Sequence, residues 1–296
     1  MIEFIDSFQK LLDFADKSNK KIYEIAQEQE AILSEVSVET VREKTLKILN
    51  TMNTTIKEGL SSSELSQSKM VGSDVFKLKK YYEKENTTLA SSYSRLLLYA
   101  LATAEQNARM GKIVACPTAG ACGIVPSAII GIADEFDFSD EQKINALLTA
   151  GMIGKIVASK TALAGAVGGC QAECGVAAAM AAGAIVQLYE GNNAQIVNAS
   201  TLALKNILGL VCDPIAGLVE VPCVKRNSFM TIHALTSAEL ALAGIESVIP
   251  ADEVVDAMKQ IGTLLPASLK ESSQAGLATT PTGMKIAQDL NEMWNN

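Results

Sequence analysis

The amino-acid sequence predicts an all-α protein: a single helical domain rich in alanine and glycine, with cysteines in loops at helix ends. Apolar residues recur every three or four positions along most of the chain, whereas the strict alternation of a β-strand is nearly absent. Aromatic residues make up only 5%, and no strand–helix alternation of the kind that builds a parallel sheet occurs. With 296 residues, 48% of them hydrophobic, the chain can bury a substantial core.

Two amphipathic segments open the chain. Helical spacing of apolar residues covers Phe4–Leu33 and Val38–Leu60, which predicts an N-terminal helical layer over residues 1–60. The serine-rich stretch SSSELSQSKMVGS follows and predicts a mobile loop over residues 61–75. Residues 76–296 would then form the main helical domain, most simply continuous with the layer before it.

Further helices are expected along the rest of the chain. Helical periodicity covers Thr88–Met110, and Gly111 stands where that helix would stop. Ser139 and Gln142 form a capping-box pattern, S-D-E-Q, ahead of the apolar run NALLTAGMIGKIVA. Similar patterns separated by Gly or Pro predict four more helices, over 194–204, 228–243, 252–264 and 284–294.

The segment Thr161–Leu188 consists almost entirely of Ala, Gly and Val, with Gln171 and Glu173 embedded in it. Small side chains let neighbouring backbones approach closely, so the segment indicates a buried helix pair. A membrane span is disfavoured, since a span needs about 20 strongly apolar residues and this run has few large side chains.

Charge and cysteine usage exclude several classes of protein. A formal net charge of -8 repels phosphate backbones, which excludes nucleic acid as the expected partner. The first residues lack the basic segment and apolar block of a secretory signal, so we expect a cytoplasmic protein with no membrane association. Cytosolic thiols are kept reduced, and the six cysteines therefore indicate metal, cluster or buried-thiol roles, not disulfides.

The spacing of the cysteines does not match a zinc ribbon, because they form no two close CxxC pairs. Cys170, Cys212 and Cys223 are all expected in loops or at helix starts, and for Cys170 and Cys212 a helix start would favour the thiolate that binds iron. Cys223 follows a proline in a loop or helix start. Cys174, one turn after Cys170 in an alanine-rich run, is more simply a small buried hydrophobic residue.

Three long segments, VACPTAGACGIVPS, GGCQAECGVAAAMAAGA and GLVCDPIAGLVEVPCVKRN, resemble the signature segments of the alpha subunit of bacterial iron-sulfur-dependent L-serine dehydratases. The resemblance spans most of the chain. It implies a four-iron, four-sulfur (4Fe-4S) cluster held by Cys170, Cys212 and Cys223, with one iron left open as a Lewis acid for the serine hydroxyl. The reaction implied is the conversion of L-serine to pyruvate and ammonia, with residues 76–296 as the cluster-binding catalytic part.

The same resemblance implies a substrate site on the PTAGA segment. Thr118, Gly120 and Ala121 would line it, and Gln171 beside the first ligand would belong to it. The small residues allow backbone N–H groups to converge on the substrate carboxylate. Cys116, Cys122 and Cys174 have no ligand role implied.

The base that removes the Cα proton is not assigned from this chain. His233, the one histidine, lies in an apolar helical pattern typical of a structural histidine. Lys225, Arg226 and Asn227 follow the third ligand and could neutralise the cluster, meet the substrate or remain solvated. The family's other half carries an SSSHT-type segment that is absent here. We therefore expect a separate beta subunit to complete the site; homo-oligomers are also possible.

Three alternatives stay open. A pyridoxal-phosphate dehydratase would need a Schiff-base lysine and a glycine-rich phosphate loop, and Lys160 in ASK is the nearest fragment. A cluster-dependent cysteine desulfidase would share the fold and differ in substrate. A non-catalytic helical subunit would keep the cysteines buried or use them for a structural cluster.

Overall fold

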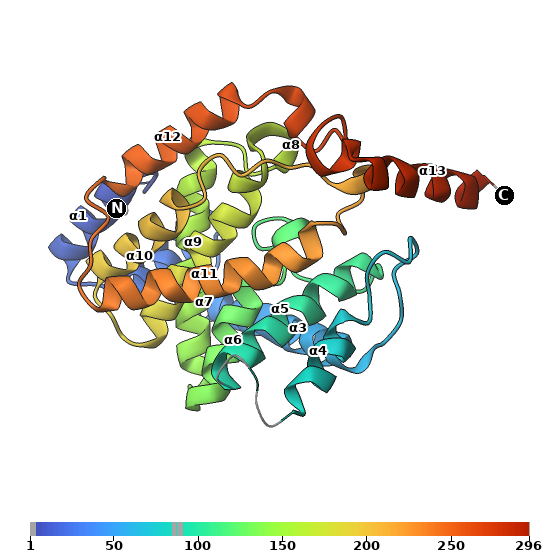
Figure 1. The fold of residues 1–296 in the computed structure, drawn as a ribbon. Coiled ribbons are helices and arrows are strands. Elements are labelled where there is room, and N and C mark those ends of the chain that lie inside the picture. Colours follow the sequence, from blue (N-terminus) through green and yellow to red (C-terminus); the bar gives the residue numbers. More distant parts are fainter. Residues whose placement is uncertain (1–3, 85–86, 88–90, 296) are drawn as a thin grey trace.

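A computed structural model describes residues 4–84, 87 and 91–295 and confirms the all-α prediction (Figure 1). No strand occurs in these ranges; two isolated bridges join Leu65 to Gly72 and Cys212 to Lys270. The α-helices are α1 (Phe8–Ser18), α2 (Ile22–Leu33), α3 (Val38–Ser61), α4 (Asp74–Tyr82), α5 (Ser91–Ala108), α6 (Ile124–Phe136), α7 (Asp140–Lys160), α8 (Gly165–Gly168), α9 (Val176–Leu188), α10 (Asn193–Lys205), α11 (Cys223–Leu242), α12 (Ala251–Leu264) and α13 (Pro281–Asn295). Short turns are η1 (Ala119–Ala121), the π turn η2 (Gln171–Gly175), η3 (Ile215–Gly217), η4 (Ala267–Leu269) and η5 (Gly276–Thr279).

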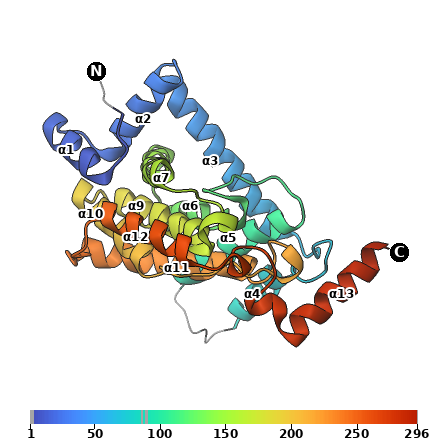
Figure 2. The ribbon, with the colours of Figure 1, turned by 90° about the horizontal axis from the view of Figure 1, so that it is seen from above.

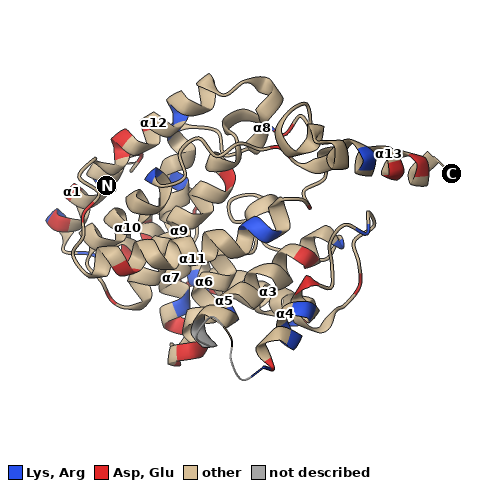
Figure 3. Ribbon diagram, in the orientation of Figure 1, with Lys and Arg blue, Asp and Glu red and all other residues tan. Residues whose placement is uncertain are grey.

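Helix α9 is the centre of the core. Every residue of α9 is buried, and α6, α7, α10 and α11 pack around it. Small residues make this packing possible: a Cβ added to Gly183 would stand 2.3 Å from Ile153 Cδ1 of α7. Figure 3 shows that α9 carries no charged residue, whereas Lys, Arg, Asp and Glu lie on the outer helices.

Two segments pass a length and composition test for membrane spans, Ala119–Phe136 and Gln171–Leu188. Their residues are 72% and 94% buried among other helices. They are therefore accounted for as core helices, as the composition of the second segment indicated.

The first predicted helical segment is two helices. Asn19 ends α1 in the left-handed conformation, at φ 51°, and its N–H bonds the carbonyl of Ala15. Asparagine tolerates this conformation better than most residues, so a single polar residue breaks the apolar periodicity. Figure 2 shows α2 and α3 meeting at an angle beside α7, against which both pack.

The serine-rich segment between α3 and α4 is anchored to the core. Ser66 and Ser68 are buried, and both hydroxyls donate to Glu220 Oε2, at 2.7 and 2.5 Å. Glu220 lies three residues before Cys223. The segment expected to be a loop thus packs against the turn that leads into α11.

The chain ends in α12 and a projecting α13. Helix α12 packs on α8 and α10, whereas α13 contacts only the short turns η3 and η5 among the element pairs with several contacts (Figure 1). Between them, residues 265–280 run back past Cys212. This crossing brings the end of the chain next to the predicted ligand loop.

Candidate active site: a thiol cluster beside a glycine loop

Cys170 is held at the entrance to the core helix. Gly169, at φ 77°, turns the chain, and a Cβ there would stand 3.0 Å from the carbonyl oxygen of Leu210. Cys170 then caps the π turn η2, whose Gln171 N–H donates to Leu210 O at 3.1 Å. Single π turns inside helical segments are frequent at functional sites. The position at a helix start agrees with the expectation for Cys170.

Cys212 lies in a loop, one of the two kinds of place expected for it, and not at a helix start. It lies in an extended segment: its N–H donates to Leu269 O at 2.9 Å, and its carbonyl accepts from Glu271 N at 2.6 Å. This pairing with the C-terminal segment has no local sequence signal. Cys223 is instead the thiol at the N-terminus of a long helix, as the first residue of α11.

The predicted ligands lie close enough to perturb one another. Hydrogen bonds from the thiols of Cys174 and Cys212 hold the pKa of Cys170 well below its usual value. In return, the hydrogen bond to Cys170, together with burial, raises the pKa of Cys174 and the pKa of Cys212. Burial and the nearby negative charge of Cys170 raise the pKa of Cys223 to about 12. The fold therefore gathers four buried thiols around one favoured thiolate.

Arg226 supplies the positive charge of this thiol cluster, defined as Cys170, Cys174, Cys212 and Cys223. Its guanidinium contacts Cys170 and adds to the lowering of that pKa. Arg226 also donates to Val211 O at 3.0 Å and to Asp213 Oδ1 at 3.2 Å. The cation is thus fixed to the Cys212 loop, whereas Lys225 turns away to pair with Asp74 at 2.9 Å.

The thiol cluster offers four sulfur atoms beside one cation, which is the kind of donor set that holds an iron-sulfur centre. No three His, Cys, Asp or Glu side chains converge on a single-ion site within the ranges that the structure describes. An iron-sulfur cluster is larger than one ion, so its thiolates need not meet at a point. Space is kept beside the sulfurs by Gly165, where a Cβ would stand 3.0 Å from Cys212 Sγ and 2.6 Å from Glu173 Oε2.

The PTAGA loop faces the thiol cluster through Glu173. A Cβ on Gly120 would lie 3.8 Å from Glu173 Oε2. Thr118 Oγ1 lies near enough to lower the pKa of that carboxyl, yet it is buried without a hydrogen-bond partner of good geometry in the described chain. The N–H groups of Ala119 and Gly120 likewise bond no other described residue. Unpaired donors of this kind suit an anion.

Asn227 joins the loop to α11. This residue is 1% exposed; its Oδ1 accepts from Gly123 N at 2.8 Å, and its Nδ2 donates to Gly120 O and Cys223 O, both at 2.9 Å. One amide therefore sets the position of the PTAGA loop relative to the third predicted ligand.

We expect Asn227→Ala to lower the free energy of unfolding by about 3 kcal/mol, because buried partners on Gly123 and Gly120 lose their hydrogen bonds. Urea denaturation of the purified chain measures this. Asn198→Ala breaks contacts of the same kind at a half-buried site, to Ile245 and Ser247, and should cost about 1 kcal/mol. Equal losses for the two variants would contradict the assignment.

Glu173 was missed as a site residue from the sequence. It lies on the π turn, and burial together with the charge of Cys170 raises the pKa of its carboxyl to about 7. Its neighbours are Thr118, Gly165 and, more distantly, Glu271. A half-buried carboxyl with a shifted pKa, between a thiol cluster and a loop with unpaired donors, is typical of a functional residue.

Other predicted residues have structural tasks. Gln171 is fully buried; its Nε2 donates to Gly168 O and Met258 O, and its Oε1 accepts from Gly209 N, which leaves its amide little capacity for a substrate. His233 contacts Ala203 O and Asn206, in agreement with a structural histidine. Lys160 pairs with Asp252 at 2.8 Å, away from the PTAGA loop.

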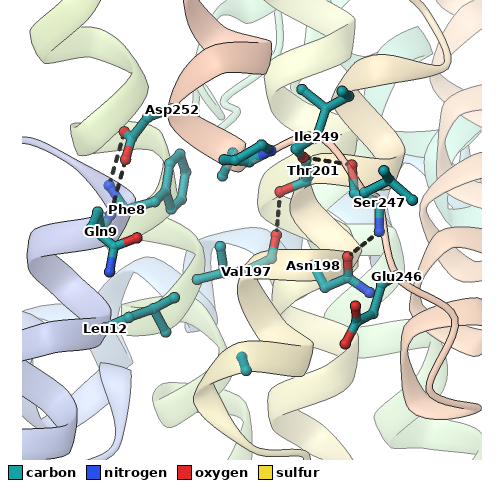
Figure 4. Close-up of a pocket in the computed structure, with 14 residues that line it drawn as sticks. Phe8, Gln9, Leu12, Val197, Asn198, Thr201, Glu246, Ser247, Ile249 and Asp252 are labelled. Carbon is teal, nitrogen blue, oxygen red and sulfur yellow. Dashed lines mark hydrogen bonds between the residues drawn. The ribbon is translucent and has the colours of Figure 1, made fainter.

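The surface pocket drawn in Figure 4 is lined by no cysteine of the thiol cluster and by no residue of the PTAGA loop. It has a volume of about 260 Å³ between α1, α10 and the start of α12. Its polar groups satisfy one another: Asp252 accepts from the N–H groups of Phe8 and Gln9, and Asn198 accepts from Ser247 N. These pairs join neighbouring helices, and Glu246 is the other charged residue of the lining.

Comparison with known proteins agrees with the motifs. The family model for the serine dehydratase alpha chain matches residues 17–278. A probable L-serine dehydratase alpha chain of Bacillus subtilis is 42% identical over 92% of this chain and 94% of its own length. The L-serine dehydratase alpha chain of Peptoniphilus asaccharolyticus is 38% identical over 97% of this chain and 98% of its own length. An L-serine dehydratase of Helicobacter pylori is 35% identical over 93% of this chain but only 61% of its own length.

The family model covers most of the chain, and the match includes every cysteine of the thiol cluster together with the PTAGA loop. Two of these relatives are matched along nearly their whole length. The chain therefore belongs to the serine dehydratase alpha chain family.

Proposed function

We propose that this chain is the cluster-binding part of an L-serine dehydratase that converts L-serine to pyruvate and ammonia in the cytoplasm. The observation that carries the proposal is the gathering of Cys170, Cys212 and Cys223 beside the PTAGA loop. These three thiolates would hold a 4Fe-4S cluster. When bound, such a cluster supplies an open iron that acts as a Lewis acid on the serine hydroxyl.

Three groups of this chain would fix the substrate. The Thr118 hydroxyl and the free N–H groups of Ala119 and Gly120 would bind the carboxylate. Glu173, between this loop and the thiols, would bind the ammonium group. Together they would present the hydroxyl on Cβ toward the cluster and hold Cα in one orientation, which is how a binding site lowers the entropic part of a barrier.

The Cα base would come from a beta chain. His233 lies ten residues along α11 from Cys223, which corresponds to about 15 Å of helix, and both of its ring nitrogens are engaged. The alpha-chain names of the relatives and the longer Helicobacter pylori protein, matched over 61% of its length, support a second part of the enzyme.

The test is anaerobic co-production with a beta chain, followed by measurement of iron, sulfide and pyruvate release. We expect about four irons and four sulfides per chain pair and turnover of L-serine. Pyridoxal-phosphate absorption with no iron would overturn the proposal. Pyruvate release from L-cysteine alone, with L-serine and L-threonine inert, would show a desulfidase instead.

A further inference from the structure

A second cavity, separate from the thiol cluster, opens between α2, α3 and α7. It has a volume of about 300 Å³, and Figure 2 shows the three helices that surround it. Its walls are mainly aliphatic and thioether side chains, among them Ile48, Met52, Leu147, Met152 and Met180. Cavities of this size with apolar walls and few polar groups are typical of small-ligand sites.

Gly151 of α7 lines this cavity and is exposed. A Cβ added to Gly151 would meet no atom within 4 Å, whereas one added to Gly154, three residues on, would stand 2.9 Å from Met180 Sδ. Close packing therefore requires the glycine at 154 but not the one at 151. Glycine weakens a helix interior and Gly151 has no packing reason of its own, and the open space in front of it leaves the cavity accessible from outside.

Two opposite charges stand at the rim. Lys155 follows Gly151 by one helical turn, on the same face of α7. Its Nζ lies 3.6 Å from Glu30 Oε2 of α2, and the two side chains are 31% and 49% exposed. That distance is too long for a good hydrogen bond, and an exposed pair of this kind contributes little stability. A zwitterion could separate the two charges at small cost.

We propose that this cavity binds an aliphatic α-amino acid. The carboxylate pairs with Lys155, the ammonium group pairs with Glu30, and the hydrocarbon side chain lies among Met52, Met152 and Met180. Flexible thioether side chains adapt to alkyl groups of different shape. L-serine has no hydrocarbon side chain to fill the cavity, so the ligand class differs from the proposed substrate.

The cavity adjoins the substrate loop through the backbone. Val114, Ala115 and Cys116 line it, and the next residues are Pro117 and Thr118 of the PTAGA loop. Cys116 N donates to Thr118 O at 3.3 Å. Occupancy should therefore change the KM for L-serine more than kcat, a consequence that rests on the proposed function, whereas the binding itself does not.

Calorimetric titration of the anaerobic alpha–beta complex with L-norleucine tests the binding. We expect saturable binding with Kd below roughly 1 mM, undiminished by saturating L-serine. Gly151→Leu, which fills the cavity, and Lys155→Met should each weaken it at least about tenfold. Gly151→Ala, which leaves most of the volume, and Lys10→Met, at a distant surface pair with Asp6, are the matched controls and should bind normally.

Several results would overturn the inference. They are absence of binding at roughly 10 mM, binding that Gly151→Leu leaves unchanged, or displacement of L-norleucine by L-serine. Hexanoate or hexylamine binding as tightly as L-norleucine would contradict the zwitterion site. Thermal unfolding of each variant checks that it is folded. Iron content and L-serine turnover of the wild type are measured in parallel, so a failure of this site and a failure of the proposed function are distinguished.

Discussion

Replacement of Cys170, Cys212 or Cys223 by serine is expected to abolish turnover of L-serine by the alpha–beta complex. The three thiols lie together beside the PTAGA loop, and loss of one proposed ligand would remove a bond to the cluster itself. Mutating residues that only support a ligand typically costs 10- to 100-fold in metal affinity or activity, so a ligand should cost more than about 100-fold. Iron, sulfide and pyruvate assays on the same preparation measure the effect.

Two other cysteines provide matched controls. Cys174 shares the thiol cluster through its contact with Cys170, but no ligand role is implied for it; Cys122 is buried elsewhere, with its thiol 3.9 Å from Thr103 O. We expect Cys174→Ala and Cys122→Ala to retain iron and most activity. If Cys174→Ala lost the cluster and Cys223→Ser kept it, the assigned ligand set would be wrong.

Helices with local signals were predictable from the sequence. The capping box at Ser139 is present, with Ser139 Oγ accepting from Gln142 N, and α7 runs to Lys160. The alanine-rich run forms the buried α9. Helices α4 and α6 were not predicted, and α11 begins five residues earlier than its periodicity indicated. Helix α6 is buried along most of its length, so no polar face marks it.

The thiol cluster was only partly predictable. Cys170 and Cys223 lie next to local features, a glycine pair and a proline, that place them at helix starts. Cys212 is positioned by the segment around Lys270, which is 58 residues away in the sequence. A local sequence pattern cannot predict a contact between segments so far apart. Cys174 was interpreted as a buried hydrophobic residue; it is buried, but against Cys170, which lies one helical turn earlier on the same face.

The serine-rich segment shows the same limit of local patterns. Its composition is typical of a loop, and it is one, but Ser66 and Ser68 are drawn into the core by Glu220, some 150 residues along the chain. A buried carboxylate needs hydrogen bonds, and hydroxyls from a distant segment provide them. Glu173 was overlooked as a site residue for the related reason that charged residues are ordinarily assigned to the surface. Arg226 was considered as a group that could neutralise the cluster, but the sequence did not distinguish this from a solvated side chain.

Glu173→Gln is expected to lower kcat/KM for L-serine by about 100-fold. The substitution keeps the shape of the side chain on the π turn but removes the charge proposed to bind the ammonium group. Breaking a fully buried ion pair by removing one partner costs roughly 3 to 5 kcal/mol. Glu173 is half-buried, so we expect a smaller loss of about 2.7 kcal/mol, which corresponds to about 100-fold. The loss should appear chiefly in KM, measured by steady-state pyruvate release.

A substrate analogue without the amino group separates binding from catalysis. 3-Hydroxypropanoate keeps the carboxylate and the hydroxyl but cannot contact Glu173 through an ammonium group. Its inhibition constant should therefore be nearly the same for wild type and Glu173→Gln. Iron content should also be unchanged, because Glu173 is not a proposed ligand.

A different pattern would assign a different task to Glu173. If kcat fell while KM stayed constant, and exchange of the Cα proton of L-serine with solvent were lost, Glu173 would be the base, and the beta chain would not be required for that step. Thr118→Val provides the complementary measurement, since it removes the buried, unpaired hydroxyl that is proposed to bind the substrate carboxylate. That variant should weaken L-serine and 3-hydroxypropanoate alike, because both carry the carboxylate that the PTAGA loop is proposed to bind.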